Sequence, residues 1–191
     1  MKDNIQKSPK FEHPVLIDRI LAHIQDELLK GIGWLDYAFG RSQRLVTKRE
    51  RNEWYYPGVY IGKNEYLNVL PGQHLGNRTF FIVSDPATLD TKQRYITLKS
   101  SVGLVCWYNL STIYPNNTER NTEAVKWKIL SLLNGIIFPS GMRMDIIRMY
   151  DQAENIFREY SLKEVDTQYL MQPYAGVRFD LNLSYREECY D

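Results

Sequence analysis

The side chains that could do chemistry in this chain are few and scattered. Histidine, the commonest metal ligand and general base, occurs only at His13, His23 and His74. No HExxH pattern places two histidines on one helix face, and no CxxC pair is present. His23 falls on the surface of a predicted helix, and His74 falls in a turn rich in proline and glycine. The sequence therefore predicts no metal site.

Patterns typical of nucleophilic catalysis and of phosphate binding are also missing from the sequence. It contains no GxSxG, no GxGxxG and no P-loop. The paired acids Asp26-Glu27 and Glu187-Glu188 are neighbours in the chain, and adjacent residues on a helix do not face the same way. We therefore expect no catalytic residue and no cofactor, and we predict that the protein is not an enzyme. An active site assembled without a local motif is the remaining route to catalysis.

The two cysteines, Cys106 and Cys189, belong to no redox motif. A disulfide between them and two buried thiols are both compatible with this count, and a reducing compartment favours the thiols. Cys106 lies within an apolar run and is interpreted as a small core residue. Cys189 lies close to the end of the sequence, where a protected pocket for a nucleophile is difficult to build.

One short segment is strongly basic. Between residues 41 and 51, the single acid Glu50 is accompanied by five basic side chains: Arg41, Arg44, Lys48, Arg49 and Arg51. A patch for DNA or for an acidic partner is one interpretation of this segment, and a solvated loop is the other. Because the charges are not interleaved with stacking residues in a known nucleic-acid module, the pattern favours the loop.

The overall composition limits the kind of partner. The 191 residues include 24 basic and 23 acidic side chains, so the formal net charge is +1, whereas proteins that bind nucleic acid through phosphates usually have a marked basic excess. With 43% hydrophobic residues, the chain can build one globular core. Its start is polar, unlike a signal peptide, and no run approaches the ~20 apolar residues of a membrane span. These features predict a soluble protein made in the cytoplasm.

Aromatic residues are abundant, with 14 Tyr and 4 Trp. The clusters at 54–56 and 107–108 are compatible with an interface rich in aromatic side chains and equally with the core of a sheet. The long connections over 32–53 and 62–77 are the segments that we expect to reach neighbouring subunits.

Two amphipathic helices are predicted. The first has Pro14 in its first turn and ends at Gly31. Its apolar residues recur at spacings of three and four: Leu16, Ile17, Ile20, Leu21, Ile24 and Leu28. The second helix starts near Thr118 and ends at Gly135. A short third helix is expected over 153–160.

The segments between the helices predict strands. Short apolar runs are separated by turn residues such as Pro57-Gly58 and Pro71-Gly72. The predicted strands cover residues 54–56, 59–61, 66–70, 79–83, 95–98 and 102–108. The last of these is apolar almost throughout, which is typical of a central strand covered on both faces. Residues 142–146 predict a further strand, and a helix through Met149 is the competing interpretation.

The clearest strand runs from Gly176 to Arg186. Its apolar side chains alternate with polar ones without a break: Val177, Phe179, Leu181, Leu183 and Tyr185. Because successive side chains in a strand point to opposite faces, one face is predicted to be apolar and the other wet. The strand would be about 35 Å long, and its apolar face needs the amphipathic helices to cover it.

These patterns predict an α+β fold with a mainly antiparallel sheet packed against two principal amphipathic helices. Residues 1–13 are expected to form a polar N-terminal lead-in, mobile as far as Phe11, and residues 14–191 a single α+β domain. No internal repeat or linker divides the sequence.

The order of an N-terminal helix, a sheet, a central helix and a long last strand resembles that of tail-terminator and head–tail joining proteins of tailed bacteriophages. The segments PGVYIGKNEYLNVLPGQ and QYLMQPYAGVRFDLNLSYREEC resemble neck proteins from phages and prophages of gut Bacteroidetes. The resemblance spans about Val15 to Cys189 and implies a tail-terminator-like fold and a structural subunit without catalytic residues.

The same resemblance implies a homo-oligomeric ring of six or twelve copies between portal or neck proteins and tail proteins. The ring would belong to the neck or tail of a virion assembled in the bacterial host cytoplasm. DNA would meet it only by passage through the channel, and no membrane contact is expected. The basic segment is then expected to contact neighbouring subunits or to line the channel through Arg41, Arg44, Lys48, Arg49 and Arg51.

Two hypotheses from other classes stay open. The first is a nucleic-acid-binding accessory protein of a mobile element, which would use the basic segment and surface aromatics. The second is a small enzyme without a local motif, which would require a deep pocket with convergent polar groups and perturbed acids.

Overall fold

The computed structural model describes residues 6–49, 52–62, 65–72, 75–85, 87–90, 96–116 and 121–186. The strands within these ranges are β1 (Tyr37–Arg49), β2 (Asn52–Gly62), β3 (Glu65–Asn68), β4 (Arg78–Val83), β5 (Thr88–Asp90), β6 (Thr97–Asn109), β7 (Met142–Tyr150) and β8 (Tyr174–Arg186). The helices are α1 (Ile17–Gly31), α2 (Leu110–Ile113), α3 (Thr122–Asn134) and α4 (Ala153–Ile156), and a 3-10 turn covers Thr167–Leu170.

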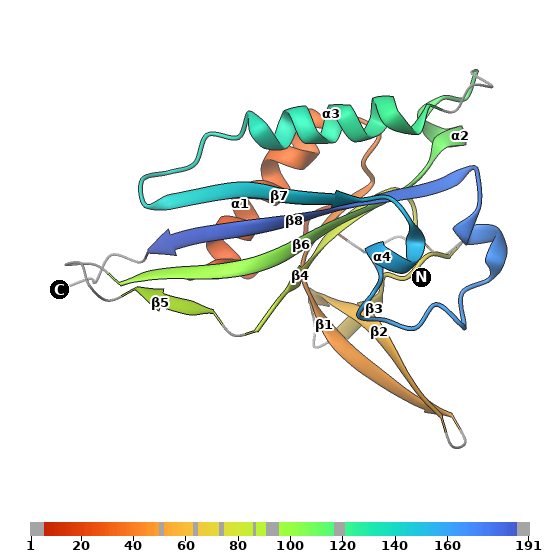
Figure 1. Cartoon of the computed structure of the whole chain (residues 1–191), viewed down its shortest axis with the longest axis horizontal. Helices are drawn as coiled ribbons and strands as arrows, with labels where there is room; N and C mark the ends of the chain where they lie inside the picture. Colours follow the sequence, from red (N-terminus) through yellow and green to blue (C-terminus); the bar gives the residue numbers. More distant parts are fainter. Residues whose placement is uncertain are drawn as a thin grey trace.

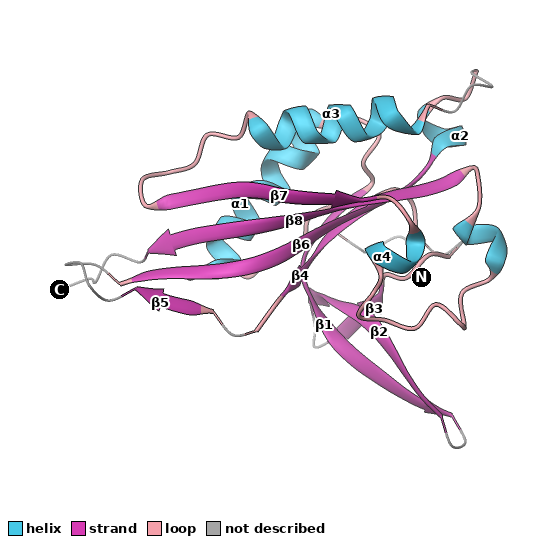
Figure 2. Ribbon diagram, viewed as in Figure 1, coloured by secondary structure: helices cyan, strands magenta, loops and turns pink. Residues whose placement is uncertain are grey.

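The described strands form one mixed, mostly antiparallel sheet, which confirms the α+β class (Figures 1 and 2). Their order is β3-β2-β1-β4-β6-β8-β7, with β5 paired to β6. β1 and β4 run parallel, and this pairing was not predicted. Apolar residues of α1 and α3 pack in one core with β6 and β8, so these helices cover the same face of the sheet.

The long last strand is confirmed. β8 pairs with β6 along its whole length, from Tyr174 to Arg186, and with β7 on its other side. The alternating side chains that were predicted to share one face are all buried: Val177, Phe179, Leu181, Leu183 and Tyr185. They lie in the core formed with α1 and α3, as the period-two alternation requires.

The opposite face of β8 is only partly wet, which corrects the sequence prediction. Arg178 points to that face and is 1% exposed, because α4 and the residues after it cover this half of the strand. Ile156 and Phe157 pack there with Trp107 in a second core. Toward the other end of β8, Asn182 is exposed, so the predicted wet face exists only beyond the reach of α4.

β6 is the central strand that the apolar run predicted. Residues 102–108 are all buried, because helices cover one face and the second core covers the other. The core interpretation of the aromatic pair Trp107-Tyr108 and of Cys106 is therefore confirmed, and burial raises the pKa of the Cys106 thiol. The aromatic cluster at 54–56 is half-buried. Cys189 lies outside the described residues.

The basic segment is not a loop, and the prediction of a solvated loop is wrong. Residues 41–49 belong to β1, which forms a long antiparallel hairpin with β2. A continuous run of strand-forming residues, Leu45, Val46 and Thr47, lies between the charges and explains the extended backbone. The strand was difficult to predict because charged residues outnumber the strand-forming ones in this segment.

β2 also runs straight through Pro57-Gly58, where a break between two strands was predicted. The carbonyl of Pro57 accepts a hydrogen bond from Val69 N at 3.0 Å, on the side away from β1. The N–H and C=O of one strand residue point to the same side, so the missing N–H of proline costs no bond to β1. In the same way, residues 97–98 and the run at 102–108 belong to the single strand β6, whereas Tyr95 lies outside the described residues.

The helix boundaries differ from the prediction by a few residues. α1 begins at Ile17 rather than at Pro14, because Leu16 has a φ of 50° and breaks the helical backbone. α3 begins after Asn121, whose side chain accepts a hydrogen bond from Ala124 N, whereas the predicted start at Thr118 lies outside the described residues. The expected helix over 153–160 is a single turn, α4, and residues 142–146 form a strand rather than a helix.

The lead-in predicted to be mobile packs on the domain in the part that the structure describes. Ala38 N donates to the carbonyl of Lys7 at 2.7 Å, and the ring of Phe11 stacks on Tyr60. Residues 1–5 lie outside the described ranges. In the described residues, no helix is both long enough and apolar enough to span a membrane.

Candidate functional site

The distal half of the β1–β2 hairpin extends beyond the sheet. β4 leaves β1 after Ser42, and β3 pairs with β2 only from Gly58 onward. Residues 44–49 and 52–57 therefore pair with each other and with no other described strand, and we call these residues the β-arm. Figure 1 shows β1 and β2 leading away together from the rest of the sheet. Of the predicted interface residues, Arg44, Lys48 and Arg49 belong to this part of β1 and Arg41 lies at its base, whereas Arg51 lies outside the described residues.

On one face of the β-arm, four side chains form a connected row. The guanidinium of Arg44 lies 3.9 Å from the centroid of the Tyr55 ring. The Tyr55 hydroxyl donates to Glu53 at 2.9 Å, and Lys48 Nζ lies 2.9 Å from the same carboxylate. The hydrogen bonds from Lys48 and Tyr55 hold the pKa of the Glu53 carboxyl below its usual value. The row ties the two strands together through three exposed side chains and the half-buried Tyr55.

The remaining predicted residues lie around this row. Arg41, at the base of the β-arm, lies 3.4 Å from Asp18 of α1. Burial raises the pKa of Asp18, and the charge of Arg41 opposes that shift. The backbone of Arg49 ends β1, while its side chain and the whole of Arg51 lie outside what the structure describes. Arg41, Arg44 and Lys48 thus share one strand but each has its own partner within the chain.

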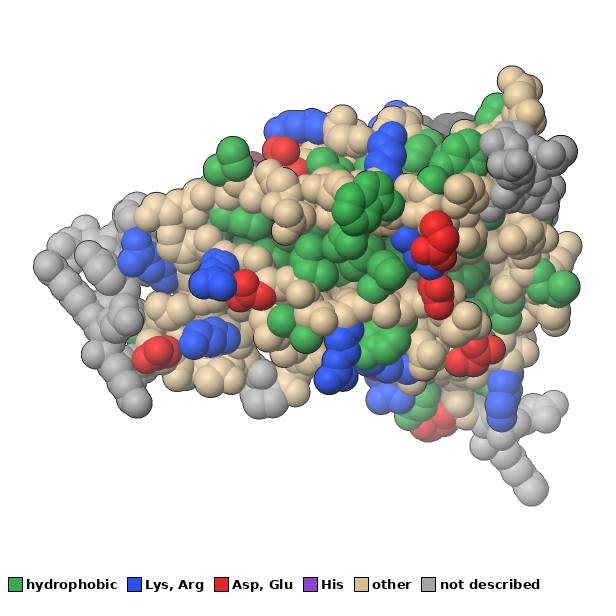
Figure 3. Space-filling model, turned by 45° about the horizontal axis from the view of Figure 1, so that its top comes forward, with side chains coloured by type: hydrophobic (Ala, Val, Ile, Leu, Met, Phe, Trp, Pro, Cys, Tyr) green, Lys and Arg blue, Asp and Glu red, His purple; other side chains and the backbone are tan. Residues whose placement is uncertain are grey.

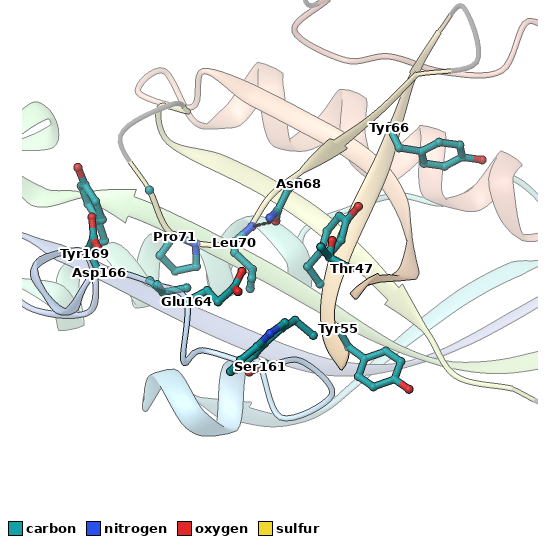
Figure 4. Close-up of a pocket in the computed structure, with 14 residues that line it drawn as sticks. Thr47, Tyr55, Tyr66, Asn68, Leu70, Pro71, Ser161, Glu164, Asp166 and Tyr169 are labelled. Carbon is teal, nitrogen blue, oxygen red and sulfur yellow. Dashed lines mark hydrogen bonds between the residues drawn. The ribbon is translucent and has the colours of Figure 1, made fainter. Parts of the chain in front are cut away.

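A cavity of about 610 Å³ opens at the base of the β-arm. Its walls come from β2, from the chain leaving β3, and from the segment after α4, with Trp54, Asn68 and Tyr169 among the lining residues. In Figure 4, Asp166 and Tyr169 lie at one end, while the rings of Tyr55 and Tyr66 point away from the labelled acids at the other end. Asp166 and the rings of Tyr55 and Tyr66 therefore do not point toward one another.

Two buried arginines hold the walls of this cavity in place. Arg78 donates to the carbonyls of Val69, Leu70 and Gly76 at 2.6–3.1 Å and so fixes the chain between β3 and β4. Burial lowers the pKa of the Arg78 guanidinium. Ser161 N, on the opposite wall, donates to Tyr55 O at 3.0 Å and joins the segment after α4 to the edge of β2.

The second buried arginine, Arg178, lies under that segment. It donates from Nη1 to Glu159 at 2.6 Å and from Nε to Asp180 at 2.8 Å. Burial raises the pKa of Asp180, but the hydrogen bonds and charges of Arg178 and Arg158 outweigh it and hold this pKa below its usual value. Gly103 makes room for the guanidinium, because a Cβ there would lie 2.7 Å from Arg178 Nε.

The histidines take part in no shared site in the described ranges. His23 is half-buried rather than fully on the surface, with Nε2 2.9 Å from the carbonyl of Ile137 and its ring against Phe138. His13 is exposed, and His74 lies outside the described residues. The described part of the chain contains no group of three or more His, Cys, Asp or Glu side chains that could hold a metal ion.

Comparison with models of known protein families gives no match, and comparison with curated protein sequences gives none either. The geometry of the described residues therefore carries the functional argument.

Sequence reasoning did not find the cavity or the β-arm. The cavity combines residues from three distant parts of the chain, so no local pattern announces it. A signal for the β-arm was present, because apolar and aromatic residues at 45–47 and 54–56 flank the basic charges on both sides. Two such runs joined by a short polar connection are typical of a hairpin.

Proposed function

We propose that this chain is a structural assembly subunit that forms part of a head–tail connector or tail-terminator ring of a tailed bacteriophage. The observation that carries the proposal is the β-arm, which extends from the sheet without a third strand in the described residues. Within the chain, the β-arm contacts the segment after α4 through the hydrogen bond from Ser161 N to Tyr55 O. Its side chains Arg44, Lys48 and Glu53 stay exposed, and a long two-stranded hairpin gains stability when such a face packs against another surface.

The chemistry of the β-arm suits a contact with another protein better than a contact with bare phosphates. Its described side chains present aromatic, basic and acidic groups together: Arg44, Val46, Lys48, Glu53 and Tyr55. Val46 is 46% exposed between the two basic residues. Tyr and Arg are enriched in protein interfaces, whereas a phosphate-binding surface would gain nothing from Glu53.

In the proposed assembly, identical copies contact one another head to tail and close into a ring of six or twelve around the DNA channel. Portal or neck proteins would bind one side of the ring and tail proteins the other. The resemblance in helix and strand order supports this setting, and the β-arm supplies a projecting contact of the kind that a ring subunit needs. No catalytic step is assigned to the ring.

The test is electron microscopy of negatively stained protein across a concentration series, together with native mass. Closed rings at high concentration are the expected result. The double variant Arg44→Glu, Lys48→Glu should stay folded by circular dichroism and lose the rings. Lys99→Glu, an exposed change of the same sign at the far end of the sheet, is the matched control and should keep them.

If the double variant forms rings as the wild type does, the β-arm has no role in the assembly. A chain that forms no ring at any concentration, and whose β-arm variants bind DNA more weakly than the wild type, would replace the proposal with the nucleic-acid-binding hypothesis. Salt dependence of that binding would separate phosphate contacts from other contacts.

A further inference from the structure

β7 ends the strand order of the described sheet. It pairs with β8 on one side and with no described strand on the other. An edge strand presents a row of unpaired backbone N–H and C=O groups, and proteins usually protect such an edge with charges, proline or a bulge. β7 has a bulge between Ile146 and Arg148, which protects its second half from pairing with another strand. Its first half, Met142–Ile146, pairs with β8 without a bulge.

The side of β7 that faces the helices is apolar. Met142, Met144 and Ile146 lie opposite Tyr185, Leu183 and Leu181 of β8 and share their face of the sheet. Together with the end of α3 they line a groove of about 420 Å³. Figure 3 shows hydrophobic side chains gathered in patches across the middle of one face of the molecule, with polar and charged groups between them.

α3 adds a large aromatic side chain above the groove. Trp127 is 69% exposed, and Asn134, two helical turns further on, lines the groove. Residues separated by seven positions lie on one side of a helix, so Trp127 belongs to the row that borders β7. A tryptophan this exposed beside an apolar groove is typical of the energetic centre of a contact surface.

The regular segment of β7 is complementary to itself. It reads Met-Arg-Met-Asp-Ile, with apolar residues at its first, third and fifth positions and opposite charges on either side of the middle. When a second copy of this segment is laid beside it antiparallel and centred on Met144, each Arg143 lies opposite Asp145 of the other copy. Met142 then lies opposite Ile146 of the other copy on the apolar face.

We propose that two copies of this chain pair through β7 in this register, with a twofold axis through Met144. The two sheets become one continuous sheet, because the backbone groups of the two free edges hydrogen-bond to each other. The axis is perpendicular to the sheet, so both α3 helices, each with its exposed Trp127, lie on the same face of the joined sheet. This contact is isologous, since the same surface serves both copies.

The charges identify a second copy as the partner rather than an arbitrary strand. Within one copy, Arg143 Nη2 lies 2.8 Å from Asp145 Oδ1, and both side chains are largely in solvent, with exposed fractions of 74% and 47%. A foreign strand would need an acid and a base two residues apart in the right order to match them. A second β7 has this pattern in its own sequence. Side chains of opposite charge that face each other across two neighbouring strands attract.

The pair does not depend on the proposed ring, because it uses the end of the sheet opposite to the β-arm. It is the form expected of the unassembled chain, in which the apolar groove and the open edge are covered. A ring built from head-to-tail contacts has two different sides. To form it, two copies paired through β7 would either have to separate or stay paired, so that two rings stack face to face. Failure of the pair would therefore leave the ring untested, and failure of the ring would leave the pair standing.

The test exchanges the charges. The variants Arg143→Asp and Asp145→Arg each place like charges opposite each other at two positions of the pair, so dimerisation measured by sedimentation should weaken at least tenfold. The double variant Arg143→Asp, Asp145→Arg restores opposite charges and should dimerise like the wild type. All three changes lie on an exposed surface, so the melting temperature of the monomer should change little.

Mixing the two single variants gives the sharpest result. The Arg143→Asp chain has acidic side chains at both positions and the Asp145→Arg chain has basic ones at both, so a heterodimer should form where neither variant pairs alone. A wild-type chain that is monomeric at high micromolar concentration would overturn the proposal. A dimer that neither single variant weakens would also overturn it, because the contact would then lie elsewhere.

Discussion

Arg178 and Glu159 form an ion pair beneath the sheet, with Nη1 of the arginine 2.6 Å from Oε2 of the glutamate. The arginine side chain is 1% exposed and the glutamate side chain 31%. This pair fastens the segment after α4 to β8, and that segment forms one wall of the cavity at the base of the β-arm. The ion pair therefore acts together with the hydrogen bond from Ser161 N to Tyr55 O in holding this wall.

Glu159→Gln should lower the free energy of unfolding by about 1–3 kcal/mol, because a buried guanidinium loses one of its charged partners. Asp180 and the carbonyl of Ile156 still accept from Arg178 and limit the loss. Glu154→Gln, an exposed change on α4, should have an effect within about 0.5 kcal/mol. Urea denaturation measures both, and equal stability of the two variants would contradict the role of the pair.

Phe179→Asp and Leu181→Asp should each prevent folding. Both side chains are at most 1% exposed on the helix-facing side of β8, where an unpaired carboxylate has no partner. Asn182→Asp, on the exposed side of the same strand, is the control and should fold normally. Circular dichroism and the soluble yield distinguish the outcomes, and a folded, soluble Leu181→Asp variant would show that this face is not buried.

Gly176→Ala should destabilise the protein by about 1–3 kcal/mol or more through overpacking. A Cβ at Gly176 would overlap the ring of Trp107, which is 3% exposed and has little room to move. At Gly33 an added Cβ meets nothing within 4 Å, so Gly33→Ala serves as the control. If the added methyl and the ring collide, Trp107→Phe combined with Gly176→Ala should lose less stability than the two single effects added together. Strict additivity would place the cost elsewhere.

Stability should fall as the pH is lowered through the acidic range, in part because of Asp180. Its pKa in the folded protein lies below the unfolded value of about 3.9, so its stabilising effect is complete above that value and is lost as the pH falls through the folded pKa. The stability difference between wild type and Asp180→Asn should therefore shrink between pH 5 and the acid limit, roughly pH 2.

β8 and α1 could be predicted because apolar residues recur in each at the regular spacing of a strand or a helix. Any element with one buried face needs such a repeat. The central position of β6 followed from its apolar run for the same reason. The order of the other strands in the sheet could not be predicted. The parallel pairing of β1 with β4, for example, depends on contacts between residues that are far apart in the sequence. The start of α1 was misplaced because the φ of 50° at Leu16 leaves no mark in the sequence.

The residues around the candidate site were harder to predict than the core. Arg178 occupies a polar position in an alternating strand, and only the cover provided by α4 turns it into a buried ion-pair residue. The five basic residues form one group in the sequence, but the strand conformation of residues 41–49 was hidden by their charge. The sequence also shows no partner for Lys48 or Arg44. In the structure, Lys48 forms an ion pair with Glu53, and Arg44 lies over the ring of Tyr55 on the neighbouring strand.

The pairing of β6 with β8 has a consequence for synthesis on the ribosome. β6 emerges well before β8, and α2, α3, β7 and α4 are made between them. Until Tyr174 and the residues after it leave the exit tunnel, the most apolar strand of the nascent chain lacks one of its two neighbours and the helices lack half of the surface they cover. The domain must therefore close late, and a chaperone that binds extended apolar segments would find its target in the half-made protein.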